Sequence, residues 1–213
     1  MFYMFKNQSY LSYKENIDFV KSCSNWQDLN NLSKKIHQKP LILSEYSERL
    51  NIVENTMKEI LCDDSWMGHC AKYQLHSGGK RFRALLALMY SDLLGVDKSI
   101  ANYAAVCSEF IHNASLIHDD LQDKDLLRRG LPTIWNRFGD HTAINLGDYF
   151  IAGSFEALAK INVNPSFKCK AVENLSYTIK QTVKGQSLEI LARTNLNLKM
   201  QDMNQLLGPK PEG

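Results

Sequence analysis

Three aspartates stand close together in the segment Asp119-Asp120-Leu121-Gln122-Asp123. The apolar pattern before them predicts a helix, so they stand at a helix C-terminus, where the dipole and mutual repulsion disfavour negative charge unless a cation compensates it. Asp119 and Asp123 share one stripe of that helix with His112, whereas Asp120 sits to the side. Carboxylates on one stripe predict a site for Mg²⁺, a hard cation that also takes phosphate oxygens. The alternative is a solvated acidic helix end.

Basic residues open another predicted helix, in the segment Gly78-Gly79-Lys80-Arg81-Phe82-Arg83. A flexible glycine turn that leads into a helix N-terminus presents backbone donors, and the three cations add charge-assisted hydrogen bonds. This combination predicts a site for a diphosphate group. It is not a Walker loop, because the required glycine spacing is missing from the segment. A basic, solvated helix start is the alternative interpretation.

Two further guanidinium groups follow the aspartates, in Arg128-Arg129-Gly130. As partners of the carboxylates alone, they would form ordinary salt bridges. Anionic and cationic groups together, however, are what the binding of a metal–diphosphate complex requires.

Three strings carry a resemblance to a known family: Gly78-Gly79-Lys80-Arg81-Phe82-Arg83, His112-Asn113-Ala114-Ser115-Leu116-Ile117-His118-Asp119-Asp120-Leu121-Gln122-Asp123 and Leu127-Arg128-Arg129-Gly130-Leu131-Pro132-Thr133. In order, spacing and residue type, they resemble the trans-isoprenyl diphosphate synthase (polyprenyl synthetase) family. Two later strings are similar to its Gly-Asp and Gly-Gln helices: Ala143-Ile144-Asn145-Leu146-Gly147-Asp148 and Gly185-Gln186-Ser187-Leu188-Glu189, with Glu189 where Asp is more usual. The resemblance covers residues 45 to 200 or so.

The resemblance implies an all-α fold, a helical bundle around a central cavity of the isoprenoid synthase type. It also implies a reaction that condenses an allylic diphosphate with isopentenyl diphosphate. The catalytic aspartates would be Asp119, Asp120 and Asp123, of which Asp119 and Asp123 would ligate Mg²⁺. Arg128 would bind the allylic diphosphate. The residues that would bind the diphosphate of isopentenyl diphosphate are Lys80, Arg83, His112 and Arg129.

The chemistry of such a reaction follows from charge. Metal ions and guanidinium groups stabilise the departing diphosphate, and the double bond of isopentenyl diphosphate attacks the allylic cation that forms. In this family the residues before the first aspartate set the product length, and here they are the small Ala114 and Ser115. They favour products of about twenty carbons or longer, so the resemblance implies a geranylgeranyl or longer-chain synthase.

Members of the family continue well past this length, with a lysine for the allylic diphosphate and a second aspartate-rich motif, and neither is found here. The last residues, Leu207 to Gly213, lose helical character. We therefore expect a C-terminally truncated member with impaired activity. The alternative is a non-catalytic partner subunit of a full-length synthase. A class I terpene cyclase is a third candidate, but Lys80, Arg83 and Arg129 argue against it, because a cyclase needs no second diphosphate site.

Periodic apolar residues predict the helices that would position these groups. We expect helices from Ser44, as a cap, to about Cys62; from after Gly79 to Leu94; from about Ile100 to Leu121; and over about 140–160 and 166–193. The helix after Gly79 is apolar nearly all round and is expected to be central. A loop with Gly130 and Pro132 follows the aspartates. Residues 1–40 are predicted to be an N-terminal extension, and 41–213 one helical domain.

Composition limits the other functions. A net charge of +2 over 213 residues gives no general attraction to nucleic acid. Neither a membrane span nor a signal peptide is evident, so we expect a cytoplasmic protein. Five cysteines without a CxxC pair predict reduced thiols, and the spacing of Cys62, His69, Cys70 and His76 disfavours a zinc site. The resemblance also implies a protein partner. This partner would be a second copy of the chain in a homodimer, or a full-length synthase in a heteromer.

Overall fold

The computed structural model describes residues 40–194, with side chains over 46–192. The chain divides into two compact units, one that ends at Lys168 and one that begins at Cys169. The predicted extension lies outside the described residues, except for Pro40, and so does the segment from Leu207 to Gly213. The assignment of one domain to residues 41–213 stays a prediction.

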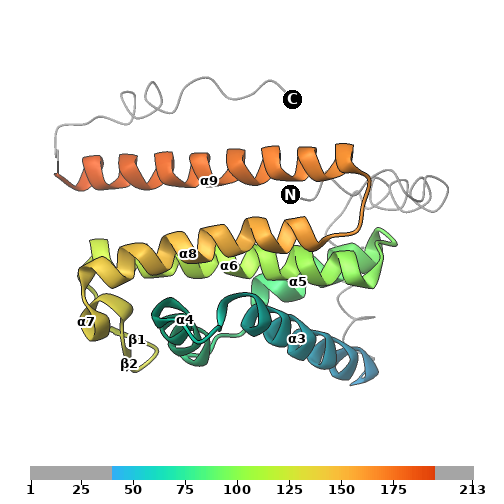
Figure 1. Cartoon of the computed structure of the whole chain (residues 1–213), viewed down its shortest axis with the longest axis horizontal. Coiled ribbons are helices and arrows are strands. Elements are labelled where there is room, and N and C mark those ends of the chain that lie inside the picture. The colour runs from blue at the N-terminus through green and yellow to red at the C-terminus, as the bar shows by residue number, and fades with distance from the viewer. Residues whose placement is uncertain (1–39, 195–213) are drawn as a thin grey trace, which may run out of the picture. The chain divides into compact units, whose positions relative to one another are not determined.

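Helices form most of the first unit over its described residues, 40–168 (Figure 1). Its longer helices are α3 (Pro40–Leu61), α4 (Trp66–His76), α5 (Phe82–Leu93), α6 (Lys98–Gln122) and α8 (Asp140–Lys160). Between α6 and α8 lie a two-stranded hairpin and a short helix: β1 (Leu127–Arg128), β2 (Leu131–Pro132) and α7 (Ile134–Phe138). The long helix α9 (Pro165–Thr194) begins at the end of this unit and makes up the described part of the second. The all-α prediction is confirmed.

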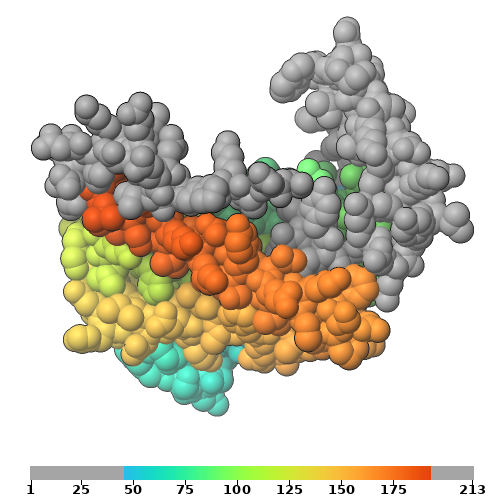
Figure 2. Space-filling model, turned by 90° about the horizontal axis from the view of Figure 1, so that it is seen from above, coloured from blue at the N-terminus to red at the C-terminus, as the bar shows by residue number. Residues whose placement is uncertain are grey.

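The core of the first unit is built around α6, which packs against α8, α5 and α3. Figure 1 shows α8 lying along α6. The buried rings of Phe110 in α6 and Phe150 in α8 meet edge to face, with centroids 5.7 Å apart. The opposite side of α8 is solvent-exposed at Asn145, Asp148 and Glu156, and Figure 2 shows this helix, yellow to orange, at the molecular surface.

Helix α6 agrees closely with its prediction and carries most of the predicted acidic site. It begins at a true cap, because the Asp97 carboxylate accepts hydrogen bonds from the N–H groups of Ser99, at 2.8 Å, and Ile100, at 3.4 Å. Small buried residues such as Ala101 and Ala105 let its neighbours approach closely. The helix is continuous from Lys98 to Gln122, so its geometry holds His112 and Asp119 on one stripe, as predicted.

On the N-terminal side of the fold, one prediction was wrong and one helix was missed. Helix α3 begins at Pro40, not at a Ser44 cap, and a proline suits a first helical turn because that turn needs no N–H donor. Helix α4 was not predicted at all. Its signal is Ser65, whose Oγ accepts a hydrogen bond from the N–H of Gly68 at 3.0 Å.

Helix α5 lies at the predicted place but is not buried all round. Its buried face comprises Ala84, Ala87, Leu88 and Ser91, whereas the Phe82 side chain is 60% exposed. A helix that packs against one side of α6 needs only one buried stripe, so the prediction of a central helix was wrong.

The segment predicted as a loop after the aspartates is a tight hairpin. Leu127 pairs with Pro132 and Arg128 with Leu131 in antiparallel register. The two turn residues between the strands, Arg129 and Gly130, both have positive φ, of 54° and 81°, as a type I′ turn requires. The Tyr73 hydroxyl donates to the Pro132 carbonyl oxygen at 2.8 Å and so holds the hairpin against α4.

None of the described helices is long and apolar enough to cross a membrane. The described cysteines, Cys62, Cys70, Cys107 and Cys169, are free thiols. Burial raises the pKa of Cys107 to about 12, so this thiol remains protonated and packs in the core as an apolar group.

Candidate functional site

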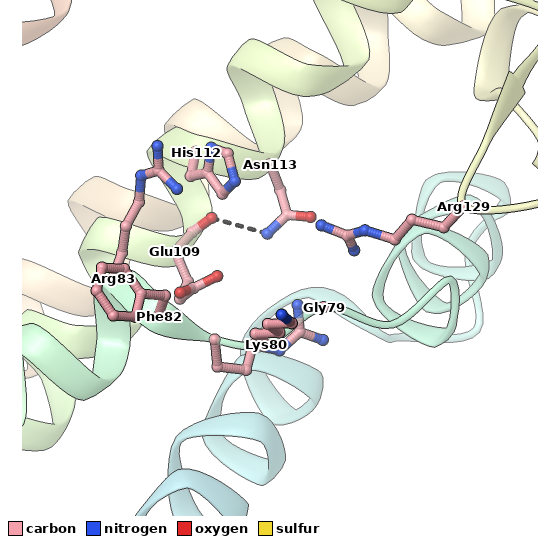
Figure 3. Close-up of a pocket in the computed structure, with 9 residues that line it drawn as sticks. Gly79, Lys80, Phe82, Arg83, Glu109, His112, Asn113 and Arg129 are labelled. Atoms are coloured by element: carbon pink, nitrogen blue, oxygen red, sulfur yellow. Dashed lines mark hydrogen bonds between the residues drawn. The ribbon is translucent and has the colours of Figure 1, made fainter.

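A pocket of about 550 Å³ opens between the start of α5, the middle of α6 and the tip of the hairpin (Figure 3). It brings together all four residues predicted to bind the isopentenyl diphosphate. The residues that line it are Gly79, Lys80, Arg81, Phe82, Arg83, Glu109, His112, Asn113 and Arg129. Four of these are Lys or Arg and one is Glu, so the pocket has the charge of an anion site.

The glycine turn before α5 is held in place by Arg81, which is 8% exposed and has a left-handed backbone with φ of 46°. Its Nε donates to Glu54 Oε1 at 3.0 Å, and its Nη2 donates to the Leu75 carbonyl oxygen at 3.0 Å. The guanidinium group is therefore committed to α3 and to the end of α4. The side chains of Lys80 and Arg83 are exposed at the pocket, where they can meet a ligand.

Arg129 reaches the same pocket from the hairpin tip. Its guanidinium lies against the backbone of Gly79, so closely that a Cβ on this glycine would be 2.8 Å from Nη1. Gly79 also has a φ of 152°, which favours glycine. Figure 3 shows Arg129 pointing inward toward Asn113, from the side opposite Arg83.

The pKa of the His112 imidazole reflects both its burial and the positive charges around the pocket. Burial, followed by the positive charges of Arg83, Arg129, Arg128 and Arg81, lowers the pKa of His112 from 6.5 to about 4. His112 is therefore neutral at physiological pH and can donate one N–H hydrogen bond to an anion.

Two lining residues from the middle of α6, Glu109 and Asn113, were not among the predicted site residues. Glu109 is 2% exposed, and its Oε1 accepts a hydrogen bond from the N–H of Ala84 at 3.0 Å. Asn113 is also 2% exposed and donates from Nδ2 to the Glu109 carbonyl oxygen at 2.8 Å. The sequence did carry a signal for Glu109, because it precedes His112 by one helical turn and shares its face.

The acidic end of α6 contains two kinds of aspartate. The Asp120 side chain is 3% exposed and forms a salt bridge with Arg128. Arg128 Nε lies 2.7 Å from Oδ1 and 2.9 Å from Oδ2, and Nη2 lies 2.5 Å from Oδ1. Arg128 was assigned to the allylic diphosphate, and Asp120 was assigned to the catalytic aspartates but not to the metal. The two side chains lie together here, and both assignments stay predictions.

Asp119 and Asp123 are the other two aspartates, one turn apart at the end of α6. Asp119 is partly buried and Asp123 is exposed, and the Asp123 N–H donates to the Asp119 carbonyl oxygen at 2.8 Å. Over residues 40–194, no group of three or more His, Cys, Asp or Glu side chains is placed to hold a metal ion.

His69 and Cys70, two of the residues in the disfavoured zinc set, have different surroundings. Cys70 is fully buried, whereas the His69 ring stacks on Trp66 with centroids 5.7 Å apart. These adjacent residues face different surroundings, as expected for neighbours on a helix.

The Gly-Asp segment lies beside the acidic end of α6. Its Gly147 has no room for a side chain, because a Cβ would overlap the His118 ring. His118 Nε2 lies 3.3 Å from the Ile144 carbonyl oxygen and 3.9 Å from Asp148 Oδ1. The Gly-Gln segment, with Gln186 and Glu189, lies in α9 in the second unit.

Known proteins resemble this chain in sequence and in fold. Residues 64–210 match the family model for polyprenyl synthetases. Geranylgeranyl pyrophosphate synthase from Geoglobus acetivorans is 34% identical over 67% of this chain and 46% of its own length, and the solved geranylgeranyl pyrophosphate synthetase of that archaeon has a TM-score of 0.66 at 29% identity, over 75% of this chain and 53% of its own.

Two other relatives add detail. Heptaprenyl diphosphate synthase component 2 from Bacillus subtilis is 32% identical over 70% of this chain and 42% of its own length. A polyprenyl synthase from Caulobacter crescentus, solved in complex with calcium and isoprenyl diphosphate, has a TM-score of 0.67 at 27% identity, over 75% of this chain and 48% of its own. The chain thus spans about half the length of the relatives it matches.

Proposed function

The chain belongs to the polyprenyl synthetase family, and we propose that it takes part in condensing an allylic diphosphate with isopentenyl diphosphate. The observation that carries this proposal is the pocket in which Lys80, Arg83, Arg129 and the neutral His112 converge. Such a group of cations with one neutral donor suits a ligand that bears several negative charges on oxygen. We assign this pocket to the diphosphate of isopentenyl diphosphate.

The allylic diphosphate is assigned to the acidic end of α6. Asp119 and Asp123 would hold Mg²⁺ there, and their carboxylate oxygens fit the hard-ligand chemistry of this ion. Two protein ligands are enough if water and phosphate oxygens supply the rest, as is common for Mg²⁺. When bound, the ion would offset negative charge on the departing diphosphate.

Arg128 would contribute to the same step by its charge. Its Nε and Nη2 are engaged by Asp120, so Nη1 and the second N–H of Nη2 would reach a phosphate oxygen. The buried Asp120 carboxylate holds the guanidinium plane at two points and thereby fixes its direction. Asp120 acts in this proposal as a positioning residue for Arg128.

The proposed reaction balances without a further reagent. The C–O bond of the allylic diphosphate breaks, and its electron pair leaves with the diphosphate. The π electrons of isopentenyl diphosphate form the new carbon–carbon bond, and a proton then passes to the released diphosphate as a double bond is restored. Lys80, Arg83, Arg129 and His112 contribute by fixing the isopentenyl group beside the allylic carbon.

The product length remains a prediction. Ala114, on α6 five residues before Asp119, is small and 3% exposed; Ser115 donates from Oγ to the His112 carbonyl oxygen at 2.9 Å. Two small residues before the aspartates leave space for a chain of about twenty carbons or longer.

A second candidate is a non-catalytic partner subunit. It is favoured by the name of one relative, component 2 of a heptaprenyl diphosphate synthase. In that role the chain would bind a full-length synthase and change its rate or product. The two functions share the family but differ in where catalysis occurs.

One experiment tests the function and separates the two candidates. Purified 213-residue chain is assayed for incorporation of labelled isopentenyl diphosphate, alone and with a full-length synthase of the family. Calorimetry with isopentenyl diphosphate, and with isopentenol as the control that lacks phosphate, tests binding separately. Turnover by the chain alone supports the enzyme; turnover that requires the partner supports the subunit; no binding of isopentenyl diphosphate contradicts the pocket assignment.

A further inference from the structure

Helix α5 enters the cationic pocket without a cap of its own. Its N-cap residue, Arg81, makes no side-chain capping hydrogen bond. The first turn of a helix has N–H groups that find no partner inside the helix, and a side-chain acceptor usually satisfies one of them at the third position. In α5 that third position is Ala84.

Glu109 supplies the acceptor from a different helix. Its Oε1 accepts the Ala84 N–H at 3.0 Å, and the side chain is almost fully buried between α5 and α6. Figure 3 shows this carboxylate directed from α6 toward the start of α5. The hydrogen bond thus joins the segment that carries Lys80 and Arg83 to the helix that carries His112.

The Glu109 backbone is braced in turn. Asn113 Nδ2 donates to its carbonyl oxygen at 2.8 Å, and Gln74 Nε2 in α4 donates to Asn113 Oδ1 at 3.2 Å. All three side chains are buried, with exposures of 6% or less. They form a polar connection from α4 through α6 to α5.

The charge of Glu109 makes its position informative. A carboxylate that lines an anion pocket repels the ligand, so it weakens binding by its direct electrostatic effect. We propose that Glu109 is a positioning residue: its hydrogen bond to Ala84 holds the start of α5 against α6, so that Lys80 and Arg83 meet the same diphosphate as His112. This inference rests on the proposed function of the pocket.

The electrostatic effect of Glu109 weakens the binding of isopentenyl diphosphate, whereas its positioning effect strengthens it. Two variants separate these effects. Glu109→Gln removes the charge but keeps a side-chain oxygen for the Ala84 N–H, whereas Glu109→Leu removes both. If positioning dominates, Glu109→Leu weakens isopentenyl diphosphate by about tenfold, the loss of one hydrogen bond to a charged group, and Glu109→Gln binds at least as tightly as wild type. An inert allylic analogue should bind all three proteins equally. Calorimetry measures each constant.

Hydrogen exchange of the Ala84 amide, followed by NMR, gives a readout that needs no ligand. We expect slow exchange in wild type and Glu109→Gln, and faster exchange in Glu109→Leu. If wild type binds no isopentenyl diphosphate, the proposed function fails, whereas equal Ala84 exchange in wild type and Glu109→Leu contradicts the positioning role itself. Glu109→Ala replaces the leucine variant if that side chain prevents folding.

Asp97→Ala is the matched control. Asp97 also caps a helix N-terminus with its carboxylate, but at the start of α6 and outside the pocket. This variant should leave the affinity for isopentenyl diphosphate unchanged. The positioning role is overturned if Glu109→Leu binds more tightly than wild type, if it weakens both ligands equally, or if Asp97→Ala reproduces its effect.

Discussion

The guanidinium of Arg129 lies directly against Gly79, where a Cβ atom would be 2.8 Å from Nη1. The two residues lie on separate turns, one that leads into α5 and one at the tip of the hairpin. Their contact brings a cation from the hairpin to the pocket that begins α5. Arg129 can hold its charge at this place only because position 79 has no side chain.

Gly79→Ala should weaken isopentenyl diphosphate by displacing Arg129. We expect a loss of about threefold to tenfold, because the cation moves out of hydrogen-bonding range and charge-assisted bonds depend steeply on geometry. Calorimetry checks the result. Gly95→Ala is the control, since Gly95 also has a positive φ, of 65°, but lies at the other end of α5; equal losses in both would indicate backbone strain alone.

The salt bridge between Asp120 and Arg128 should contribute to stability. Asp120→Asn leaves the guanidinium without its charge partner. We expect the free energy of unfolding in urea to fall by about 2–3 kcal/mol. This is at the low end for buried pairs, because Arg128 is partly exposed. The surface pair Lys160–Glu156, at 3.3 Å, gives the comparison: Glu156→Gln should cost less than about 0.5 kcal/mol. Similar costs for the two would show that Asp120 contributes little.

His112 should lower the free energy of unfolding as the pH falls from about 6.5 to about 4. Its pKa is lowered to about 4 in the folded chain, from about 6.5 unfolded. Between these values the unfolded chain binds the proton and the folded chain does not, so acid favours unfolding; below about 4 this contribution no longer changes. Urea unfolding across that range gives the free energy of unfolding at each pH. Plotted against pH, it should change less steeply for His112→Gln than for wild type. A parallel pair of curves would contradict it.

The acidic end of α6 should bind its ligand only with a divalent cation. Asp119→Ala or Asp123→Ala should abolish the Mg²⁺-dependent binding of an inert allylic diphosphate analogue, because each removes a charged oxygen ligand. Chelation of Mg²⁺ from wild type should have the same effect. Asp125→Ala, in the nearby loop, serves as the control. Undiminished affinity in either α6 variant would refute the metal assignment.

Much of the fold could be predicted where local pattern and packing agree. Helix α6 has a cap at Asp97 and a long apolar stripe, so its bounds were predicted within about two residues. The start of α3 was predicted at Ser44 instead of Pro40, because proline can stop a helix or begin one and neighbouring residues do not decide between these roles. The hairpin was missed because its two-residue strands are too short for a periodic signal.

The site divides in the same way. Lys80, Arg83, His112 and Arg129 were predicted from motifs, and the structure places them around one pocket. The bond between Arg128 and Asp120 was not predicted, because spacing cannot show which of three adjacent carboxylates a turn will bring to a guanidinium. Glu109 was passed over although it shares a helix face with His112. Its partner is a backbone N–H of another helix, and no residue pattern reveals a contact of that kind.

The most direct test compares two ligands on one set of variants. Lys80→Ala, Arg83→Ala and Arg129→Ala are each titrated with isopentenyl diphosphate and with an inert allylic diphosphate in Mg²⁺, beside Lys160→Ala as a surface control. We expect each pocket variant to lose about 1.5–3 kcal/mol of binding free energy for isopentenyl diphosphate, with little change for the allylic ligand. Equal losses for both ligands, or none for isopentenyl diphosphate, would contradict the assignment of the pocket.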